Sequence, residues 1–157
     1  MTGRSDSPEM AFAFEVRVDV GPDEHVGHGE GDVLLFVPIL GGTVDGPRLR
    51  GAVVPGGGDW YVRRSLTCCH LDARYLLRAE DGALIDVANR GFYRTRTAEL
   101  MARADAGEPI EAADVYYRTS PVFRTDAPSH RWLSESVFVG LAREEKGQIC
   151  IRFFEVL

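Results

Sequence analysis

The sequence lacks any long hydrophobic run. Within its 157 residues no stretch of consecutive apolar residues reaches the roughly 18 that a transmembrane helix needs. The N-terminus also lacks the basic region followed by an apolar region that marks a secretory signal peptide. We therefore expect a soluble, cytoplasmic protein without a membrane partner.

Cysteine is scarce, and its spacing excludes the usual cysteine-based sites. The three cysteines are the adjacent Cys68 and Cys69 and the distant Cys150. An odd count without a C-x-x-C pair gives neither a disulfide framework nor a zinc site. Buried, reduced thiols are the favoured interpretation.

Basic residues are also fewer than acidic residues. The chain has 18 Lys and Arg against 24 Asp and Glu, for a net charge of −6. Residues 1–32 hold two arginines and eight acids, so this portion alone contributes 2 − 8 = −6 and the remainder is balanced. Without a basic stripe to release counterions from phosphates, nucleic acid is not an expected partner.

Motifs for nucleotide binding and hydrolase chemistry are absent. No G-x-x-x-x-G-K-[ST] loop, G-x-G-x-x-G fingerprint or G-x-S-x-G elbow occurs. The spacing H-x-x-H-x-E-x-D at His25, His28, Glu30 and Asp32 is compatible with metal ligation, but we expect an acidic, solvated loop over residues 21–32. No metal site and no cofactor are predicted.

What the sequence does contain is the pattern of a β-rich protein. Residues 12–20 alternate apolar and polar side chains, and residues 33–40 form an apolar run suited to a strand buried on both faces or lining a closed barrel. One short helix is predicted over residues 97–106, with Thr97 at its start. Further strands are predicted over residues 49–54, 59–63, 70–79, 83–91, 115–124, 136–143 and 148–156.

Glycine and proline are frequent in the segment before Asp59 and Trp60. Gly41-Gly42, Gly46-Pro47 and Pro55 to Gly58 are predicted to be turns or bulges, because glycine reaches positive φ and proline fixes φ. We expect this segment to present the acid and the indole as part of a polar site.

The strand count favours a single closed domain. About nine or ten mainly antiparallel strands and one short helix predict an all-β barrel or sandwich, and closure is favoured because it removes exposed edges. We expect this domain to span residues 11–157 behind an unstructured tail at residues 1–10.

A β-hairpin is predicted around Asp81-Gly82. With a two-residue turn, Arg74 faces Asn89 on one side of the hairpin, and Tyr75 lies near Arg90 on the other. A loop one residue longer would exchange the faces of the second strand.

Four separated blocks carry a resemblance to a known family. The blocks read GGTVDGPRLRGAVVPGGGDW, LDARYLLRAEDGALIDVANRG, YYRTSPVFRTDAP and WLSESVFVG. Together they resemble the domain of unknown function 3237 family across residues 11–157, which implies a lipocalin-like or allene-oxide-cyclase-like up-and-down β-barrel and a link to natural-product metabolism, but no established activity. At residues 33–36 this chain is apolar where family members usually carry arginine, which implies a more apolar pocket wall and ligand.

The polar positions that match the family are the candidate site. Acid, phenol and guanidinium groups inside a barrel could move a proton, hold a carboxylate or oxyanion, and stack on an unsaturated substrate. The candidate catalytic residues are Asp59, Tyr75 and Tyr117, and the candidate substrate-binding residues are Trp60, Arg74, Asn89, Arg90, Arg118 and Trp132.

Each candidate also has a purely structural alternative. An arginine such as Arg90 or Arg118 suits a ligand oxyanion, but an ion pair with Asp72 or Asp86 across the hairpin explains it equally well. Asp59 is either a base whose pKa rises on burial or an acid that closes a glycine turn. Tyrosine and tryptophan are ordinary residues of barrel walls.

The favoured hypothesis is a cofactor-independent enzyme that acts inside the barrel on a small, apolar, oxygenated metabolite by isomerase, cyclase or lyase chemistry. The alternative is a carrier or sensor that binds such a metabolite unchanged. The C-terminal strand could close the barrel or pair with a second chain, so a homodimer is also an alternative.

Overall fold

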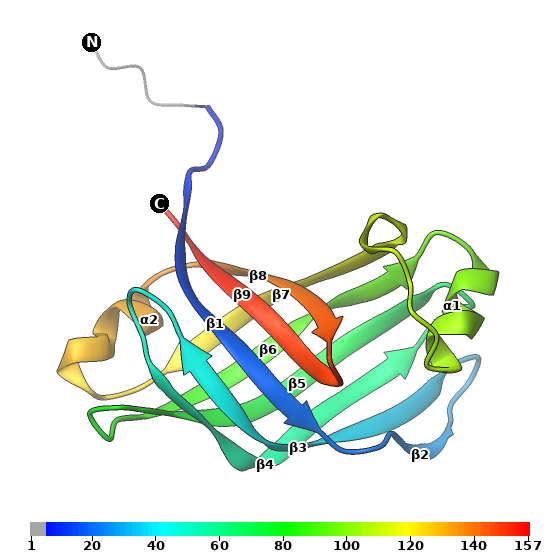
Figure 1. Cartoon of the computed structure of the whole chain (residues 1–157), viewed down its shortest axis with the longest axis horizontal. Coiled ribbons are helices and arrows are strands. Elements are labelled where there is room, and N and C mark those ends of the chain that lie inside the picture. Colours follow the sequence, from blue (N-terminus) through cyan, green and yellow to red (C-terminus); the bar gives the residue numbers. More distant parts are fainter. Residues whose placement is uncertain (1–5) are drawn as a thin grey trace.

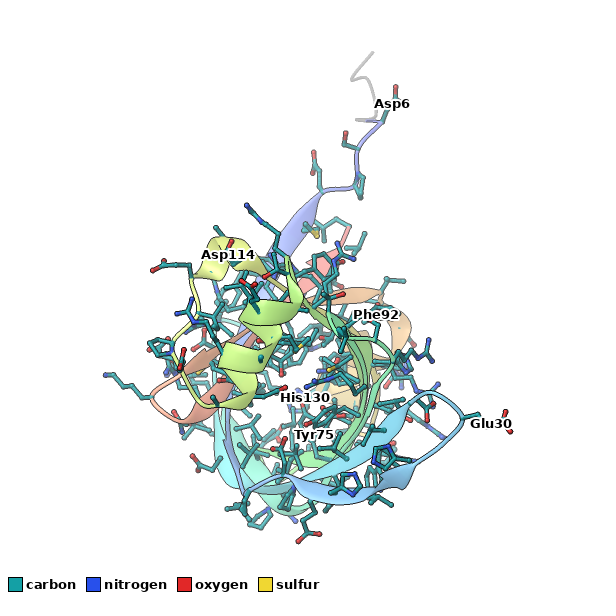
Figure 2. The ribbon with its side chains drawn as sticks, turned by 90° about the vertical axis from the view of Figure 1, so that its right-hand side faces the viewer. Asp6, Glu30, Tyr75, Phe92, Asp114 and His130 are labelled. Carbon is teal, nitrogen blue, oxygen red and sulfur yellow. The ribbon has the colours of Figure 1, made fainter. Side chains whose placement is uncertain are left out.

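Nine β-strands form one antiparallel sheet in this computed structural model, which describes residues 6–157. The strand order is β1-β9-β8-β7-β6-β5-β4-β3-β2, and β1 also pairs with β3. The sheet therefore closes into an up-and-down barrel of β1 and β3 to β9, with β2 added beside β3 (Figures 1 and 2). The predicted antiparallel barrel is confirmed. The strands are β1 (Met10–Val20), β2 (Glu24–His28), β3 (Val33–Asp45), β4 (Gly51–Arg63), β5 (Cys68–Ala79), β6 (Leu84–Thr95), β7 (Val115–Arg124), β8 (Phe138–Glu145) and β9 (Gln148–Val156).

Two short α-helices lie at opposite ends of the barrel (Figure 1). The predicted helix is α1 (Ala98–Asp105), and the Thr97 hydroxyl accepts a hydrogen bond from the Leu100 N–H at its start. The other, α2 (Arg131–Glu135), was not predicted, because five residues are too few to show a helical period. Two 3-10 turns complete the set, at Ala112–Asp114 and Pro128–His130. No helix within residues 6–157 is long and apolar enough to cross a bilayer.

The backbone just before β1 lies beside the C-terminus. Residues 1–5 of the predicted unstructured tail lie outside the described part of the chain. The Glu9 carbonyl, just before β1, accepts a hydrogen bond of 2.8 Å from the Leu157 N–H. Ordered pairing therefore begins within the predicted tail.

The predicted acidic loop contains a strand. β1 pairs with residues 39–45 of β3, and after the bend at Gly21-Pro22 β2 continues along the same edge and pairs with residues 33–36. The rings of His25 and His28 lie 5.2 Å apart on β2. This strand is held by backbone pairing, and its side chains are mostly exposed. The sequence therefore shows no alternation of apolar residues from which the strand could have been predicted. Among residues 6–157 no three His, Cys, Asp or Glu side chains are grouped to hold a metal ion.

The glycine-rich positions inside β3 and β4 are bulges within long strands. Separate strands were predicted over residues 49–54 and 59–63, but β4 runs through both. Its pairing with β5 shifts between Val54 and Gly58, which accommodates extra residues of β4. β3 likewise continues through Gly41-Gly42.

The hairpin of β5 and β6 has the longer of the two loops considered. Arg74 pairs with Ala88, not Asn89, and the Ala79 N–H bonds the Ala83 carbonyl, which leaves a three-residue loop. The faces of β6 are therefore exchanged relative to the two-residue turn. Asn89 joins Tyr75 on the inner face, and this register also buries Ile85 and Val87.

An aromatic cluster fills the end of the barrel that α2 covers. Phe14, Phe123, Phe138 and Phe153 are almost fully buried, with neighbouring ring centroids 5.1 to 5.7 Å apart. Leu133 of α2 packs against the same core. Such tilted and edge-on aromatic packing fills this half of the barrel.

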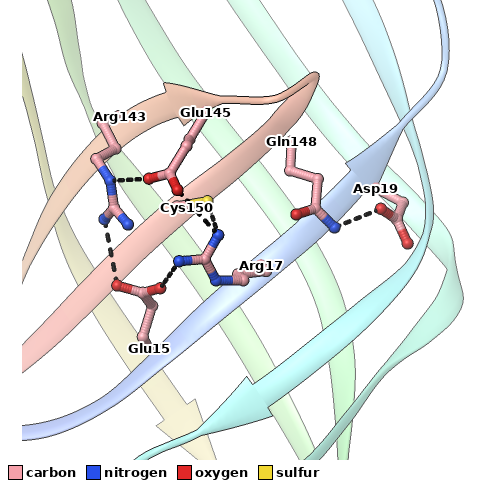
Figure 3. Close-up of polar contacts among 7 residues, drawn as sticks. All are labelled: Glu15, Arg17, Asp19, Arg143, Glu145, Gln148 and Cys150. Carbon is pink, nitrogen blue, oxygen red and sulfur yellow. Dashed lines mark hydrogen bonds and ion pairs between the residues drawn. The ribbon is translucent and has the colours of Figure 1, made fainter.

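Charged side chains connect the outer faces of the strands that close the barrel (Figure 3). Arg17 of β1 pairs with Glu15 at 3.0 Å and with Glu145 at 3.5 Å, and Arg143 pairs with the same two acids at 3.2 and 2.8 Å. The Cys150 thiol is buried beneath them, with Arg17 Nη1 3.6 Å from its sulfur. The network joins β1, β8 and β9 where the first and last parts of the chain meet.

Two neighbouring glycines of the β4 bulge provide a test of this geometry. Both have positive φ, but a Cβ on Gly57 would lie 2.2 Å from the Arg74 carbonyl oxygen, whereas one on Gly56 would meet nothing within 4 Å. Gly56→Ala should therefore incur only a conformational cost of about 1 kcal/mol. Gly57→Ala also displaces β5 and should lose roughly 2 kcal/mol more. Urea unfolding measures both, and equal losses would contradict the bulge geometry.

Candidate functional site

The half of the barrel away from the aromatic cluster encloses a cavity of about 640 Å³. Figure 2 views the barrel from the end that carries α1 and β2 and shows Tyr75 inside the ring of strands. Most of the wall is apolar, and Val33 and Leu35 belong to it, as the apolar segment at residues 33–36 implied. A cavity of this size can hold one small ligand.

Strand alternation points Asp59 into this cavity from β4. Its Oδ1 accepts a hydrogen bond of 2.8 Å from the Asp72 N–H. Burial raises the pKa of the Asp59 carboxyl to about 6, the Asp72 N–H partly opposes this shift, and the negative charges of Asp72 and Asp23 add to it. Asp59 therefore titrates close to neutral pH.

Two buried tyrosines share the cavity with Asp59. Burial raises the pKa of Tyr75 and of Tyr117 far above the ordinary value, and the Asp59 charge raises both further. The Asn89 amide lies near enough to Tyr75 to favour its ionised form, but no hydrogen bond of acceptable geometry joins the two side chains. Both phenols therefore stay protonated near neutral pH and are available as hydrogen-bond donors.

The structure thus brings together four of the nine residues singled out from the sequence. Asp59, Tyr75, Asn89 and Tyr117 all line the cavity. Their catalytic and binding roles remain predictions.

The other five lie outside the cavity, because alternation turns the neighbouring positions outward or because they sit at the other end of the barrel. Arg74 and Arg90 form the ion pairs considered as the structural alternative, with Asp86 at 3.1 Å and with Asp72 at 3.0 Å. On the outer side of the barrel wall, Trp60 contacts Phe36 and Arg118 donates to the Tyr117 carbonyl. Trp132 of α2 lies at the other end of the barrel, where it packs against the aromatic cluster and beneath Arg48.

Polar residues at the mouth of the cavity were missed by the sequence analysis. Tyr61 donates a hydrogen bond of 2.6 Å to Asp23, and Arg63 binds Asp105 of α1 through two contacts of 3.0 and 2.6 Å. Arg63 also contacts the Cys69 sulfur at 3.2 Å. The alternation that places Asp59 inside also places Tyr61 and Arg63 inside, whereas nothing in the sequence joins α1 to β4.

Acidic residues outnumber basic residues in the lining of the cavity. Asp23, Asp59, Asp105 and Glu144 line it, and Arg63 is the single cation among its lining residues. The ion pair with Asp105 engages this guanidinium and raises the pKa of Arg63. Burial and the neighbouring Asp23 raise the pKa of Glu144. A carboxylate ligand therefore finds no unpaired cation here.

Helix α1 covers part of the cavity mouth. Met101 is buried against Cys69 and Leu71, and Ala104, Asp105 and Gly107 complete the cover. Among the ion pairs within residues 6–157, only that of Arg63 with Asp105 ties the helix to the barrel. The cover therefore depends on one partly exposed ion pair and one apolar contact.

Loss of this ion pair should loosen α1 without unfolding the barrel. Asp105→Asn is expected to speed amide hydrogen exchange in residues 98–105 by up to about fivefold, since a partly exposed pair contributes up to about 1 kcal/mol. The matched control is Glu108→Gln, because Glu108 pairs with Arg103 at 2.9 Å without reaching the barrel. Equal exchange rates in the two variants would refute the tethering role of Asp105.

The raised pKa of Asp59 predicts a defined pH dependence of stability. The folded pKa of about 6 exceeds the ordinary 3.8, so the contribution of Asp59 to stability is greatest below about pH 4 and declines as the pH rises through 6. Asp59→Asn should therefore exceed wild type in free energy of unfolding by on the order of 2 kcal/mol at pH 8 and match it near pH 4. Asp45→Asn, at a side chain 79% exposed, should follow wild type throughout. A gain that does not depend on pH would contradict the assigned pKa.

Comparisons with known proteins reveal relatives over nearly the whole chain. A family model described as "Protein of unknown function (DUF3237)" matches residues 8–156. An uncharacterised UPF0311 protein of Rhodopseudomonas palustris is 33% identical over 149 residues, which are 95% of this chain and 97% of that protein.

Solved structures show the same barrel. A conserved protein of unknown function from R. palustris superposes with a TM-score of 0.90 at 31% identity, covering 98% of this chain and 100% of that one. A β-barrel-like protein from Acinetobacter baumannii gives 0.81 at 26% identity, with coverage of 98% and 100%. An enzyme from Penicillium herquei gives 0.73 at 19% identity over the full length of both chains, a likeness of fold alone.

Proposed function

The chain belongs to the DUF3237 family of proteins of unknown function, and we propose that it is a small-molecule-binding barrel that catalyses cofactor-independent acid–base chemistry. The observation that carries the proposal is a single deep carboxyl, Asp59, with a pKa of about 6 in a largely apolar cavity. A group that titrates near the working pH can both take a proton from a substrate and return it.

The tyrosines complement this role. Asp72 occupies Oδ1 of Asp59, so Oδ2 remains available to a substrate C–H or O–H proton. As that proton leaves, negative charge develops on a substrate oxygen, and Tyr75 or Tyr117 can stabilise it by donating a hydrogen bond. Return of the proton to another atom gives isomerisation, cyclisation or elimination.

The wall of the cavity supports a small, apolar, oxygenated substrate. Apolar side chains from β1, β3, β5 and β9 surround the polar groups. The family resemblance adds natural-product metabolism as a setting. The Penicillium herquei enzyme shares the fold at 19% identity, so the proposal rests on the cavity and not on that likeness.

A carrier or sensor is the second candidate. The same apolar wall and the cover formed by α1 would retain a ligand without any proton transfer. The two candidates differ in whether Asp59 is needed for turnover or only for the shape of the cavity.

Untargeted mass spectrometry of a host extract incubated with the protein distinguishes them. We expect wild type to consume a metabolite and Asp59→Asn to lower the rate by about 10²-fold or more while retaining binding. Asp86→Asn makes the same chemical change on the outer face and should leave the rate unaltered. A metabolite that wild type retains unchanged would instead establish the carrier, and full turnover by Asp59→Asn would refute the role of Asp59.

A further inference from the structure

Three buried polar atoms of residues that line the cavity have no hydrogen-bond partner within residues 6–157. They are Tyr75 Oη, Asn89 Oδ1 and Thr119 Oγ1. Their residues are 4%, 3% and 4% exposed, and all three line the cavity. A buried polar atom without a partner costs about 1–3 kcal/mol, so three in one cavity indicate a bound group that satisfies them.

The three residues form a diagonal row on the inner face of neighbouring strands. Asn89 of β6 lies opposite Ala73, two positions from Tyr75 on β5. On its other side Asn89 lies opposite Pro121, two positions from Thr119 on β7. Diagonal neighbours of this kind lie within reach of long and aromatic side chains, and the Asn89 amide lies close to Tyr75.

The Thr119 hydroxyl occupies space left by a glycine. Gly140 of β8 pairs with Thr119, and a Cβ at Gly140 would lie 2.2 Å from Thr119 Oγ1. The absence of that side chain leaves space for the Thr119 hydroxyl beside β8.

We infer that the row of Tyr75, Asn89 and Thr119 recognises a neutral hydroxyl group, as in an alcohol, phenol or enol. Asn89 Oδ1 only accepts hydrogen bonds, whereas Tyr75 and Thr119 can donate. A ligand hydroxyl donates to Asn89 and accepts from either neighbour. A carbonyl cannot donate to Asn89, and a carboxylate also meets the negative charge of Asp59.

This inference deepens the proposed function and rests on its small-molecule cavity. It replaces the carboxylate ligand that the predicted inner arginines suggested, because Arg74, Arg90 and Arg118 do not line the cavity. A ligand hydroxyl bound at the row would lie beside Asp59. Asp59 pairs with Ala73 of β5, and Ala73 lies opposite Asn89.

A matched series of probes tests the inference. The probes are naphthalene, 2-naphthol, 2-naphthoate and 2-naphthylmethylammonium, measured by calorimetry and saturation-transfer NMR at pH 7. We expect 2-naphthol to bind about tenfold or more tightly than naphthalene, since one buried hydrogen bond contributes about this factor, and 2-naphthoate to bind most weakly. Preference for the carboxylate or for the ammonium would overturn the inference, because charge and not the row would then select the ligand.

Substitutions within the row test which of its residues bind the ligand hydroxyl. Tyr75→Phe and Asn89→Leu should reduce the advantage of 2-naphthol over naphthalene to below about threefold while the affinity for naphthalene itself is kept. Tyr116→Phe, on the outer face of β7, is the matched control and should retain the full advantage. An unchanged advantage in both row variants would refute the assignment.

The unliganded protein offers a second readout that does not depend on binding. Tyr75→Phe and Thr119→Val each remove an unpartnered buried hydroxyl, so both should raise Tm by about 2–4 °C. A lower Tm in both would show that the hydroxyls already have partners, and would overturn the inference.

The outcomes separate this inference from the proposed function. If none of the four probes binds wild type, both fail together. If 2-naphthol is preferred and Asp59→Asn keeps full turnover of the native metabolite, the binding role of the row is supported and the catalytic role of Asp59 is refuted.

Discussion

Pairing between β1 and β3 closes the sheet, and this closure fixes which side of every strand faces inward. Once the ring is complete, a residue cannot change sides without a shift in register along a whole strand. Asp59, Tyr75, Asn89 and Thr119 share one interior because each lies at an inward position of its own strand. The same constraint sends the arginines between them to the outer wall, where acids of adjacent strands meet them.

The barrel divides its interior into two halves with different physical character. Around Phe14 and Phe153 the space is filled by aromatic rings, which supply the packing that stabilises the fold. In the other half the strands enclose a cavity and hold polar atoms away from water without pairing them. Aromatic packing is thus concentrated at one end, and three of the four buried, unpartnered side-chain polar atoms of residues 6–157 lie in the other half.

The fold was predictable because alternation and turn residues act locally. The strand over residues 12–20, the helix capped by Thr97 and the barrel itself all followed from the sequence. The site was only half predictable. One residue in the loop after Ala79 decides whether Asn89 or Arg90 faces inward, and burial of Ile85 and Val87 settles it in the folded chain. The pairing of Arg63 with Asp105 joins residues 42 positions apart and leaves no local signal.

The aromatic cluster has a consequence for the kinds of reaction the barrel can host. Because it fills the end beneath α2, the cavity is closed at that end and lies in the half of the barrel that carries α1. In the proposed function, substrate and product would both pass through the end that carries α1, and a product would leave before the next substrate enters. For such an enzyme, a cavity closed at one end would favour rearrangement of a single molecule over the joining of two, since a second reactant would have to pass the first.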